Sequence, residues 1–390
     1  MPWQEVSVMD QRREFVHLAM QDGVNRRELC RRYGISPEIG YKWLARFAAG
    51  DTALDDRSRR PHRSPRRSDA AAEARVLAVR DAHPAWGARK IHRCLERDGV
   101  TPPALSTVHE ILRRCGRVIP PQDGRKAYQR FEKEAPNLLW QMDFKGSMPL
   151  TSGVLCHPLT VIDDHSRYAL CIGACANQQT RTVQDQLTAT FRRYGLPDAF
   201  FVDNGPPWGD SSQPRWTRLG VWLLKLGVDV WHARPRHPQS RGKNERFHRT
   251  LKAEVFKMRS FRDLPELQRA FDIWRNVYNL ERPHDALDLN VPASRYRPSC
   301  RAMPDRLPRV EYDSHEIVRR VSSTKDYVSF KGRLWNVPRA FRGECLAIRP
   351  LAQDGRFGIF FGSRLIATID LTANRPVSHV SEQVSAMSPG

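Results

Sequence analysis

Residues 138–144 read Leu-Leu-Trp-Gln-Met-Asp-Phe, and this stretch decides how the rest of the chain is interpreted. A central apolar strand has little reason to carry the charged Asp143 unless a cation neutralises it. Two further apolar runs of strand length follow at 156–163 and 168–174, and Asp-Asp-His-Ser-Arg at 163–167 forms the turn between them. The three runs predict the first strands of a sheet that holds a charged site.

Strands and helices alternate beyond these three runs. We predict a helix at 180–194 that ends at Gly195, a strand at 199–202, a helix at 215–226, a strand at 228–231, and helices at 243–256 and 264–278. Three meandering strands followed by alternating elements predict an α/β core, a mixed five-stranded sheet with helices on both faces. Asp203 follows its strand directly, at the carboxyl edge where open sheets present their sites.

The N-terminal region is predicted to be all-α. Residues 10–49 indicate three short helices separated by glycine turns, and Ser36 caps the third helix with Pro37 at its first position. This is the helix-turn-helix layout, whose last helix enters the major groove, although a generic three-helix bundle has the same pattern. Lys42 and Arg46 on the third helix are candidates for DNA contact.

A second helix-turn-helix unit is predicted at residues 69–116. Ser106 is its expected cap, and Val108, Ile111 and Leu112 share an apolar stripe. Between the two units lies an extended Arg- and Pro-rich segment, which suits either contact with phosphates or a solvated spacer. Its residues predicted to bind DNA are Arg57, Arg59, Arg60, Arg66 and Arg67.

Short apolar runs separated by glycine turns predict a small C-terminal β-barrel at residues 309–375, with a tail at 376–390. The complete predicted division is 1–55 (helix-turn-helix), 56–68 (linker), 69–118 (second helix-turn-helix), 119–136 (linker), 137–292 (core), 293–308 (linker), 309–375 (barrel) and 376–390 (tail).

Charge and composition restrict the class of partner and the compartment. Lys and Arg total 64 against 43 Asp and Glu, a formal net charge of +21, which predicts salt-dependent binding to a polyanion. The eight cysteines form no CxxC pair, which argues against a structural zinc site and for a reducing compartment. The sequence has neither a signal peptide nor a membrane-length apolar stretch. We therefore expect a cytoplasmic protein that binds a polyanion and has no membrane partner.

A strongly basic segment at residues 232–252 surrounds a single acid, Glu245. On a helix, Glu245, Arg249 and Lys252 share one face. If Asp143, Asp203 and Glu245 come together in the fold, their carboxylates repel one another unless their pKa values rise or they bind metal. Their hard oxygen ligands suit Mg²⁺ or Mn²⁺. Taken singly, each acid is a weak signal, because an Asp at a strand end is more often a turn cap and a lone Glu among basic residues is either an ion-pair partner or a metal ligand. The helix face with Arg249 and Lys252 is predicted to meet DNA. Arg241 and Lys243, in the same basic segment, are also predicted to bind DNA.

Several motifs together resemble the insertion-sequence transposases of the DDE superfamily, which have a retroviral-integrase-like core. The matching pieces are Trp140-Gln-Met-Asp-Phe144, Val161-Ile-Asp-Asp-His-Ser-Arg167, Phe201-Val-Asp-Asn-Gly205, His237-Pro-Gln-Ser-Arg-Gly-Lys-Asn-Glu-Arg-Phe-His248 and Tyr278-Asn-Leu-Glu-Arg-Pro-His284. The resemblance implies an RNase H-like core in which Asp143, Asp203 and Glu245 are the catalytic acids, holding two Mg²⁺ ions that Mn²⁺ can replace, with Lys252 on DNA nearby.

The resemblance implies a DNA transposase that binds the terminal inverted repeats of its element, then cleaves DNA and joins it to target DNA. Holding two ends together implies a homodimer or larger assembly on double-stranded DNA. Two departures are a longer gap between Asp203 and Glu245, with the excess around 210–214, and the lack of a His-His-Cys-Cys zinc module. A regulator with an inactive core and a nuclease without joining activity are the alternatives.

The conspicuous pair Asp163 and Asp164 is not expected to bind metal. Both lie in a tight turn, where Asp commonly hydrogen-bonds the nearby backbone. The turn should lie at the far end of the sheet from the centre of strand 138–144, or near the sheet edge. We expect Asp164→Asn to remove a turn bond worth about 1 kcal/mol.

Overall fold

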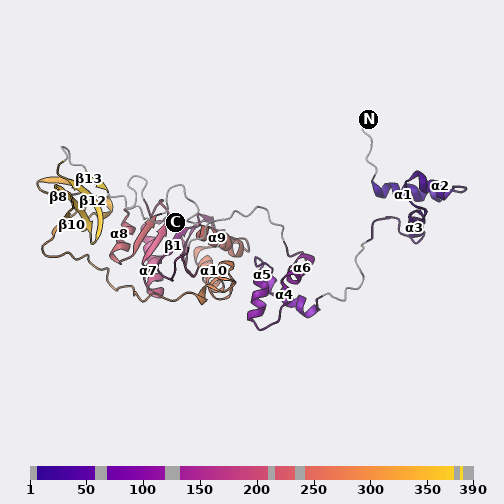
Figure 1. The fold of residues 1–390 in the computed structure, drawn as a ribbon, viewed down its shortest axis with the longest axis horizontal. Coiled ribbons are helices and arrows are strands. Elements are labelled where there is room, and N and C mark those ends of the chain that lie inside the picture. The colour runs from indigo at the N-terminus through magenta and orange to yellow at the C-terminus, as the bar shows by residue number, and fades with distance from the viewer. Residues whose placement is uncertain are drawn as a thin grey trace, which may run out of the picture. The chain divides into compact units, whose positions relative to one another are not determined.

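The computed structural model describes residues 7–57, 68–118, 132–209, 216–232, 242–372 and 378–380, and it divides into two compact units, Met1–Arg67 and Ser68–Gly390. The first unit contains three helices, α1 (Val8–Ala19), α2 (Arg26–Arg32) and α3 (Pro37–Ala48) (Figure 1). The Ser36 hydroxyl accepts a hydrogen bond from the backbone N–H of Ile39, and Pro37 opens α3, as predicted. Phe15, Leu29 and Trp43 form the centre of its core.

The second unit begins with three helices, α4 (Ala70–Ala82), α5 (Ala88–Arg97) and α6 (Leu105–Arg114). The predicted stripe of Val108, Ile111 and Leu112 is fully buried. The predicted cap at Ser106 is wrong, because α6 already begins at Leu105 and Ala104 occupies the cap position with an extended backbone (ψ 148°). A residue inside the first turn has helical dihedrals and does not act as the N-cap.

The central sheet is mixed, as predicted, but it has six strands rather than five. They are β1 (Trp140–Phe144), β2 (Met148–Pro149), β3 (Leu155–Asp163), β4 (Ala169–Cys175), β5 (Ala199–Val202) and β6 (Asp229–His232). The order is β2-β3-β1-β5-β6, with β4 on β3; β1 is antiparallel to β3 and parallel to β5. The additional strand, β2, is only two residues long and pairs with the start of β3, so it has no periodic pattern to detect.

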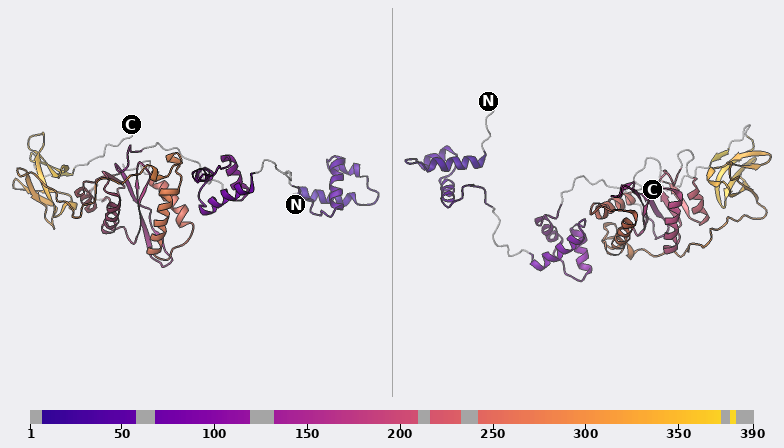
Figure 2. Two further views of the ribbon diagram at one scale, coloured as in Figure 1. Left: turned by 90° about the horizontal axis from the view of Figure 1, so that it is seen from below. Right: turned by 180° about the vertical axis from the view of Figure 1, so that it is seen from behind.

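Helices cover both faces of this sheet, as predicted (Figure 2). On one face, Trp140 and Met142 of β1 share a core with α7 (Thr180–Tyr194) and α8 (Arg218–Lys225). On the other face, Ile162 of β3 packs with α9 (Gly242–Leu251) and α10 (Leu264–Asn276). The last two helices continue as π-helical turns at Lys252–Phe256 and Val277–Glu281, whereas the sequence pattern predicts helices at 243–256 and 264–278 without such turns.

The C-terminal region is built from two sheets. A five-stranded sheet has the order β13-β12-β11-β10-β7, and β8 pairs with β9. The strands are β7 (Ile317–Arg320), β8 (Tyr327–Phe330), β9 (Arg333–Asn336), β10 (Cys345–Pro350), β11 (Arg356–Phe361), β12 (Arg364–Asp370) and β13 (Ser378–Val380). Among the strands described, β13 and β7 end the larger sheet without pairing to each other, so a closed barrel is not confirmed.

The predicted tail at 376–390 needs correction, because β13 lies within it and pairs with β12. The edge of β12 offers backbone hydrogen bonds that a free tail would leave to water.

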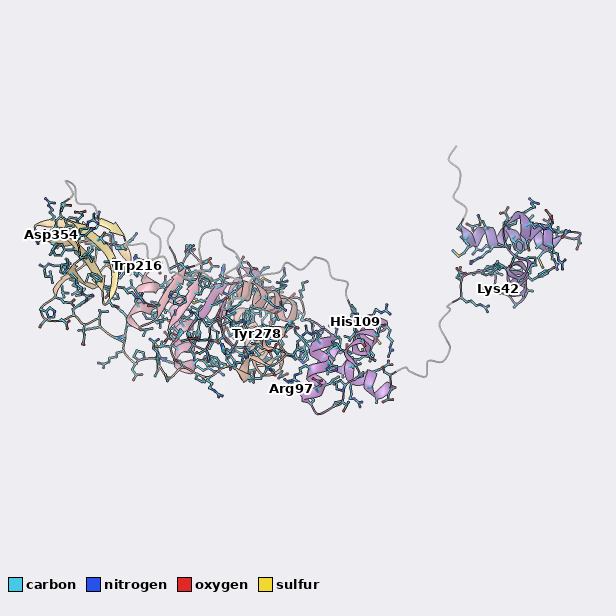
Figure 3. The ribbon with its side chains drawn as sticks, in the orientation of Figure 1. Lys42, Arg97, His109, Trp216, Tyr278 and Asp354 are labelled. Atoms are coloured by element: carbon cyan, nitrogen blue, oxygen red, sulfur yellow. The ribbon has the colours of Figure 1, made fainter. Side chains whose placement is uncertain are left out.

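An apolar contact attaches these sheets to the core. Val221 of α8 belongs to the C-terminal hydrophobic cluster, and Trp216 packs edge-on against Phe341 at 5.2 Å (Figure 3). Lys225 pairs with Glu344 at 2.5 Å beside it. Short 3₁₀ turns occur at Asp285–Leu287, Pro292–Ser294 and Arg339–Phe341. None of the helices in the described ranges has the length and apolar character needed to span a membrane.

Gly195, the C-cap of α7, lies where the backbone has little room for a side chain. It has φ +77°, and a Cβ there would lie 2.6 Å from the carbonyl oxygen of Ser299. We expect Gly195→Ala to lower the free energy of unfolding by roughly 3 kcal/mol, because left-handed strain and a backbone clash add together. Gly153→Ala is the matched control: φ is +84° but nothing lies within 4 Å, so about 1 kcal/mol is expected. Equal losses in urea unfolding would contradict this interpretation.

Candidate active site

The strand pairing brings Asp143 and Asp203 to the same edge of the sheet. The parallel register joins Trp140 to Phe200 and Gln141 to Phe201, and two residues beyond the last of these pairs are Asp143, in β1, and Asp203, which directly follows β5. Neighbouring strands lie about 4.8 Å apart, so the two backbones are adjacent at this point.

The alternation of side chains along the strands puts both aspartates on the α9 face. Four residues of β1 and β5 contribute to the core on the opposite face: Trp140, Met142, Phe200 and Val202. Because successive side chains of a strand point to opposite faces, Asp143 and Asp203 point away from that core. Both are partly exposed, and Asp203 Oδ1 accepts a hydrogen bond of 2.9 Å from the Gly205 N–H.

Helix α9 carries Glu245 and is attached to this same face at two places. Before Glu245, the Lys243 ammonium pairs with the buried Asp164 carboxylate at 2.5 Å. After it, His248 Nε2 lies 2.8 Å from the Thr160 hydroxyl, and Thr160 is the antiparallel partner of Asp143. Glu245 itself is exposed. Within the described ranges, no three His, Cys, Asp or Glu side chains are grouped closely enough to hold a metal ion.

Asp163 and Asp164 have different roles, although they are adjacent. Asp163 behaves as a turn residue: its Oδ1 accepts hydrogen bonds from the Ser166 N–H (2.7 Å) and hydroxyl (2.6 Å). The turn lies beside Trp140 at the start of β1, away from Asp143, as the register Trp140↔Asp163 requires.

Asp164 does not make the predicted turn bond. Its carboxylate is fully buried and bonds Gln141 Nε2 at 2.7 Å, the Lys133 N–H at 2.8 Å and the Lys243 ammonium. It therefore holds β1 and α9 together, and we expect Asp164→Asn to cost more than the roughly 1 kcal/mol of a turn bond, because a buried ion pair would be broken.

Two basic side chains, Lys145 and His248, belong to the surroundings of the Asp143 strand position: Lys145 is two residues further along the chain, and His248 contacts Thr160, the strand partner of Asp143. Lys145 follows Asp143 in sequence, and its ammonium lies 5.4 Å above the Phe256 ring. Burial, and then repulsion from Lys252, lower the pKa of Lys145. Desolvation and then Lys145 lower the pKa of His248 to about 4, so this imidazole is neutral at pH 7.

The sequence pattern did not single out Lys145, Thr160 and His248. One local signal could have indicated His248. It lies about one helical turn after Glu245, next to Phe247 and three residues before Leu251, and both of these residues are buried.

The residues predicted to contact DNA divide into three groups. Lys42 (Figure 3), Arg57, Arg249 and Lys252 are exposed. Two others bind inside the protein: Lys243 pairs with Asp164, and Arg46 bonds Asp51 at 2.5 Å with only 11% of its side chain exposed. The prediction for Lys243 and Arg46 therefore requires both to leave internal partners. Arg59, Arg60, Arg66, Arg67 and Arg241 lie outside the described residues.

Asp164→Asn should destabilise the protein far more than the loss of a turn bond. It removes the negative charge that pairs with the Lys243 ammonium, whose side chain is only 15% exposed. Breaking a buried pair costs about 3–5 kcal/mol, which urea unfolding would measure. The double variant Asp164→Asn/Lys243→Met removes both charges and should recover part of the loss. If Asp164→Asn alone cost no more than about 1 kcal/mol, the ion pair would contribute little.

The neutral state of His248 predicts an acid-sensitive fold. Burial lowers its pKa from the ordinary histidine value of 6.5 to about 4 in the folded protein. Between these values the unfolded chain binds a proton that the folded chain does not, so the free energy of unfolding falls as the pH falls from 6.5 to 4. The full effect is on the order of 3 kcal/mol. His248→Gln should flatten this part of the stability curve, whereas His109→Gln, on the exposed surface of α6 (Figure 3), should not.

Comparison with protein families gives matches along most of the chain. Two models described as "Integrase core domain" match residues 133–238 and 226–292. A "Helix-turn-helix domain" model matches 11–62, and a "Homeodomain-like domain" model matches 39–112. A model described as "IS481 family transposase, C-terminal domain" matches 316–376. Together with the mixed sheet, these matches confirm the predicted helix-turn-helix regions and RNase H-like core.

Individual relatives are also mobile-element proteins. The "Insertion element IS407 uncharacterized 31.7 kDa protein" of Burkholderia multivorans is 26% identical over 226 residues, 56% of this chain and 78% of that protein. The "Insertion element IS476 uncharacterized 39.2 kDa protein" of Xanthomonas euvesicatoria is 25% identical over 233 residues, 57% of this chain and 64% of that protein. A chain of a simian T-cell lymphotropic virus intasome, solved in complex with PP2A regulatory subunit B56 gamma, is 16% identical, covering 77% of this chain and 100% of that chain at a TM-score of 0.37. The family matches and the insertion-element relatives support the interpretation of this chain as an insertion-sequence DNA transposase with an integrase core domain.

Proposed function

We propose that Asp143, Asp203 and Glu245 are the catalytic acids of a polynucleotidyl transferase that cleaves the ends of its element and joins them to target DNA. The observation that carries the proposal is the register of β1 and β5, which aligns the two aspartates on the face covered by α9. Glu245 comes from that helix, at an exposed position two residues after the anchored Lys243.

The donor set fits hard divalent cations, because carboxylate oxygens on an accessible edge leave room for water and phosphate. Mg²⁺ is the expected ion, with Mn²⁺ as a substitute, and Asp143, Asp203 and Glu245 would hold two such ions. Bound there, the ions would activate the attacking oxygen and stabilise the leaving oxygen of the phosphodiester. Since these three carboxylates are not grouped closely enough to hold a metal ion among the described residues, the proposal requires them to come closer together when metal and DNA bind.

The surrounding basic residues would bind the DNA backbone. Arg249 and Lys252 are exposed on the helix that carries Glu245 and on its π-helical continuation, and Lys145 lies close to Lys252. Cations at this edge would hold the phosphates beside the carboxylates and offset the repulsion between substrate and acids.

The other parts of the chain would select and pair the DNA ends. We assign recognition of the terminal inverted repeats to the two helix-turn-helix units, with Lys42 of α3 among the contacts. The C-terminal region, which we propose closes into a small barrel, would support assembly and contributes no catalytic group. A homodimer or larger complex would hold two ends for joining.

Charge-neutral variants of the three acids test the site assignment. Asp143→Asn, Asp203→Asn and Glu245→Gln should each reduce cleavage and joining of the gene's own flanking DNA by at least about a thousandfold, because each removes a proposed metal ligand. Binding of the same DNA should remain. Asp185→Asn, on the exposed surface of α7, is the control with normal activity. Near-normal cleavage by any of the three variants in Mg²⁺ would overturn the assignment.

A further inference from the structure

The hydroxyl of Thr160 occupies a defined position in a chain of two hydrogen bonds. Thr160 is fully buried, and its Oγ1 donates to the backbone carbonyl of Asp143 at 3.0 Å. A hydroxyl has a single proton, so its contact with His248 Nε2 at 2.8 Å is one in which the imidazole donates. His248 is therefore the tautomer protonated on Nε2, and it links α9 to the strand position of Asp143.

Apolar side chains surround this link between α9 and the sheet. Phe247 and Leu251 of α9 pack with Ile162 of β3 in one hydrophobic cluster, on the same face as Thr160. Apolar packing would be enough to hold a helix on a sheet, but it defines the position of the helix along the strand less precisely than a hydrogen bond does. A buried polar pair penalises a shifted helix, because the displaced groups would lose their partners.

The pair also brackets Glu245 together with a second polar contact. Lys243 bonds Asp164 two residues before Glu245, and His248 bonds Thr160 three residues after it. On the strand side, the Asp164 N–H bonds the carbonyl of Leu139, and Thr160 pairs with Asp143. Both ends of the turn that carries Glu245 are thus fixed relative to β1.

We propose that Thr160 and His248 are positioning residues that set the distance between Asp143 and Glu245, and hence the geometry in which the two carboxylates can share metal ions. The inference rests on the proposed function, because it takes both acids as ligands. Neither Thr160 nor His248 touches substrate or metal in this role. Each acts through the backbone of an acid-bearing element.

Four substitutions distinguish the effect of the two hydrogen bonds from the effect of side-chain packing. Thr160→Ser keeps the hydroxyl, whereas Thr160→Val keeps the shape and loses it. His248→Gln keeps an N–H donor, whereas His248→Leu removes it. The full-length protein is titrated with Mn²⁺, free Mn²⁺ is followed by electron paramagnetic resonance, and thermal unfolding shows that each variant is folded. Asp143→Asn is included to test the ligand assignment separately.

We expect Thr160→Val and His248→Leu to weaken Mn²⁺ binding about tenfold or more, the range typical of groups that orient metal ligands. Thr160→Ser and His248→Gln should stay within about threefold of the wild type. The double variant Thr160→Val/His248→Leu should be no weaker than the single variants, because both remove the same link.

Two results would overturn the proposal, and they are distinguishable. If Asp143→Asn loses Mn²⁺ while folded Thr160→Val binds it normally, the positioning role is wrong and the catalytic site stands. If Asp143→Asn binds Mn²⁺ like the wild type, both the ligand assignment and the positioning role are wrong. If Thr160→Val proves unfolded, the comparison of Thr160→Ser with His248→Leu tests the proposal instead. Equal Mn²⁺ affinities of these two variants would overturn the positioning role, and a roughly tenfold difference would support it.

Discussion

The pairing of β1 on both of its edges is the constraint on which the rest of the core depends. Its antiparallel bonds to β3 place Thr160 beside Asp143, and its parallel bonds to β5 pair Gln141 with Phe201, two residues before Asp143 and Asp203. A slip of one residue in either pairing would turn every side chain of the slipped strand to the other face. The apolar residues Trp140 and Met142 oppose such a slip, because it would move them out of a buried core.

Helix α9 depends on the same strand for its position. Hydrophobic packing through Phe247 supplies its attachment to the sheet, and two polar contacts on either side of Glu245 define its register. Buried polar groups are costly unless they are satisfied, so they stabilise one arrangement mainly by penalising the others. This division of labour suits a helix whose glutamate would have to meet ligands from two different strands.

The large positive charge serves two purposes that the sequence does not separate. Some cations neutralise buried or half-buried acids: Lys243 pairs with Asp164, and Arg46 with Asp51. Others, such as Lys42, Arg249 and Lys252, lie exposed and remain candidates for DNA contact. The net charge of +21 therefore supports attraction to a polyanion, but it does not identify the basic residues that meet the phosphates.

Local pattern was enough to determine the element types and most of their positions. Helix 180–194 and strand 199–202 were predicted to the residue, since apolar period and the closing Gly195 are local signals. The sequence motifs also identified the three acids as candidates. Only the tertiary structure decided which polar groups meet: Asp164 with Lys243, and Thr160 with His248, are 79 and 88 residues apart. Such pairs depend on strand register and helix placement, which arise from packing over the whole core and leave no periodic trace in the sequence. The two-residue strand β2 and the strand in the expected tail were missed for the same reason.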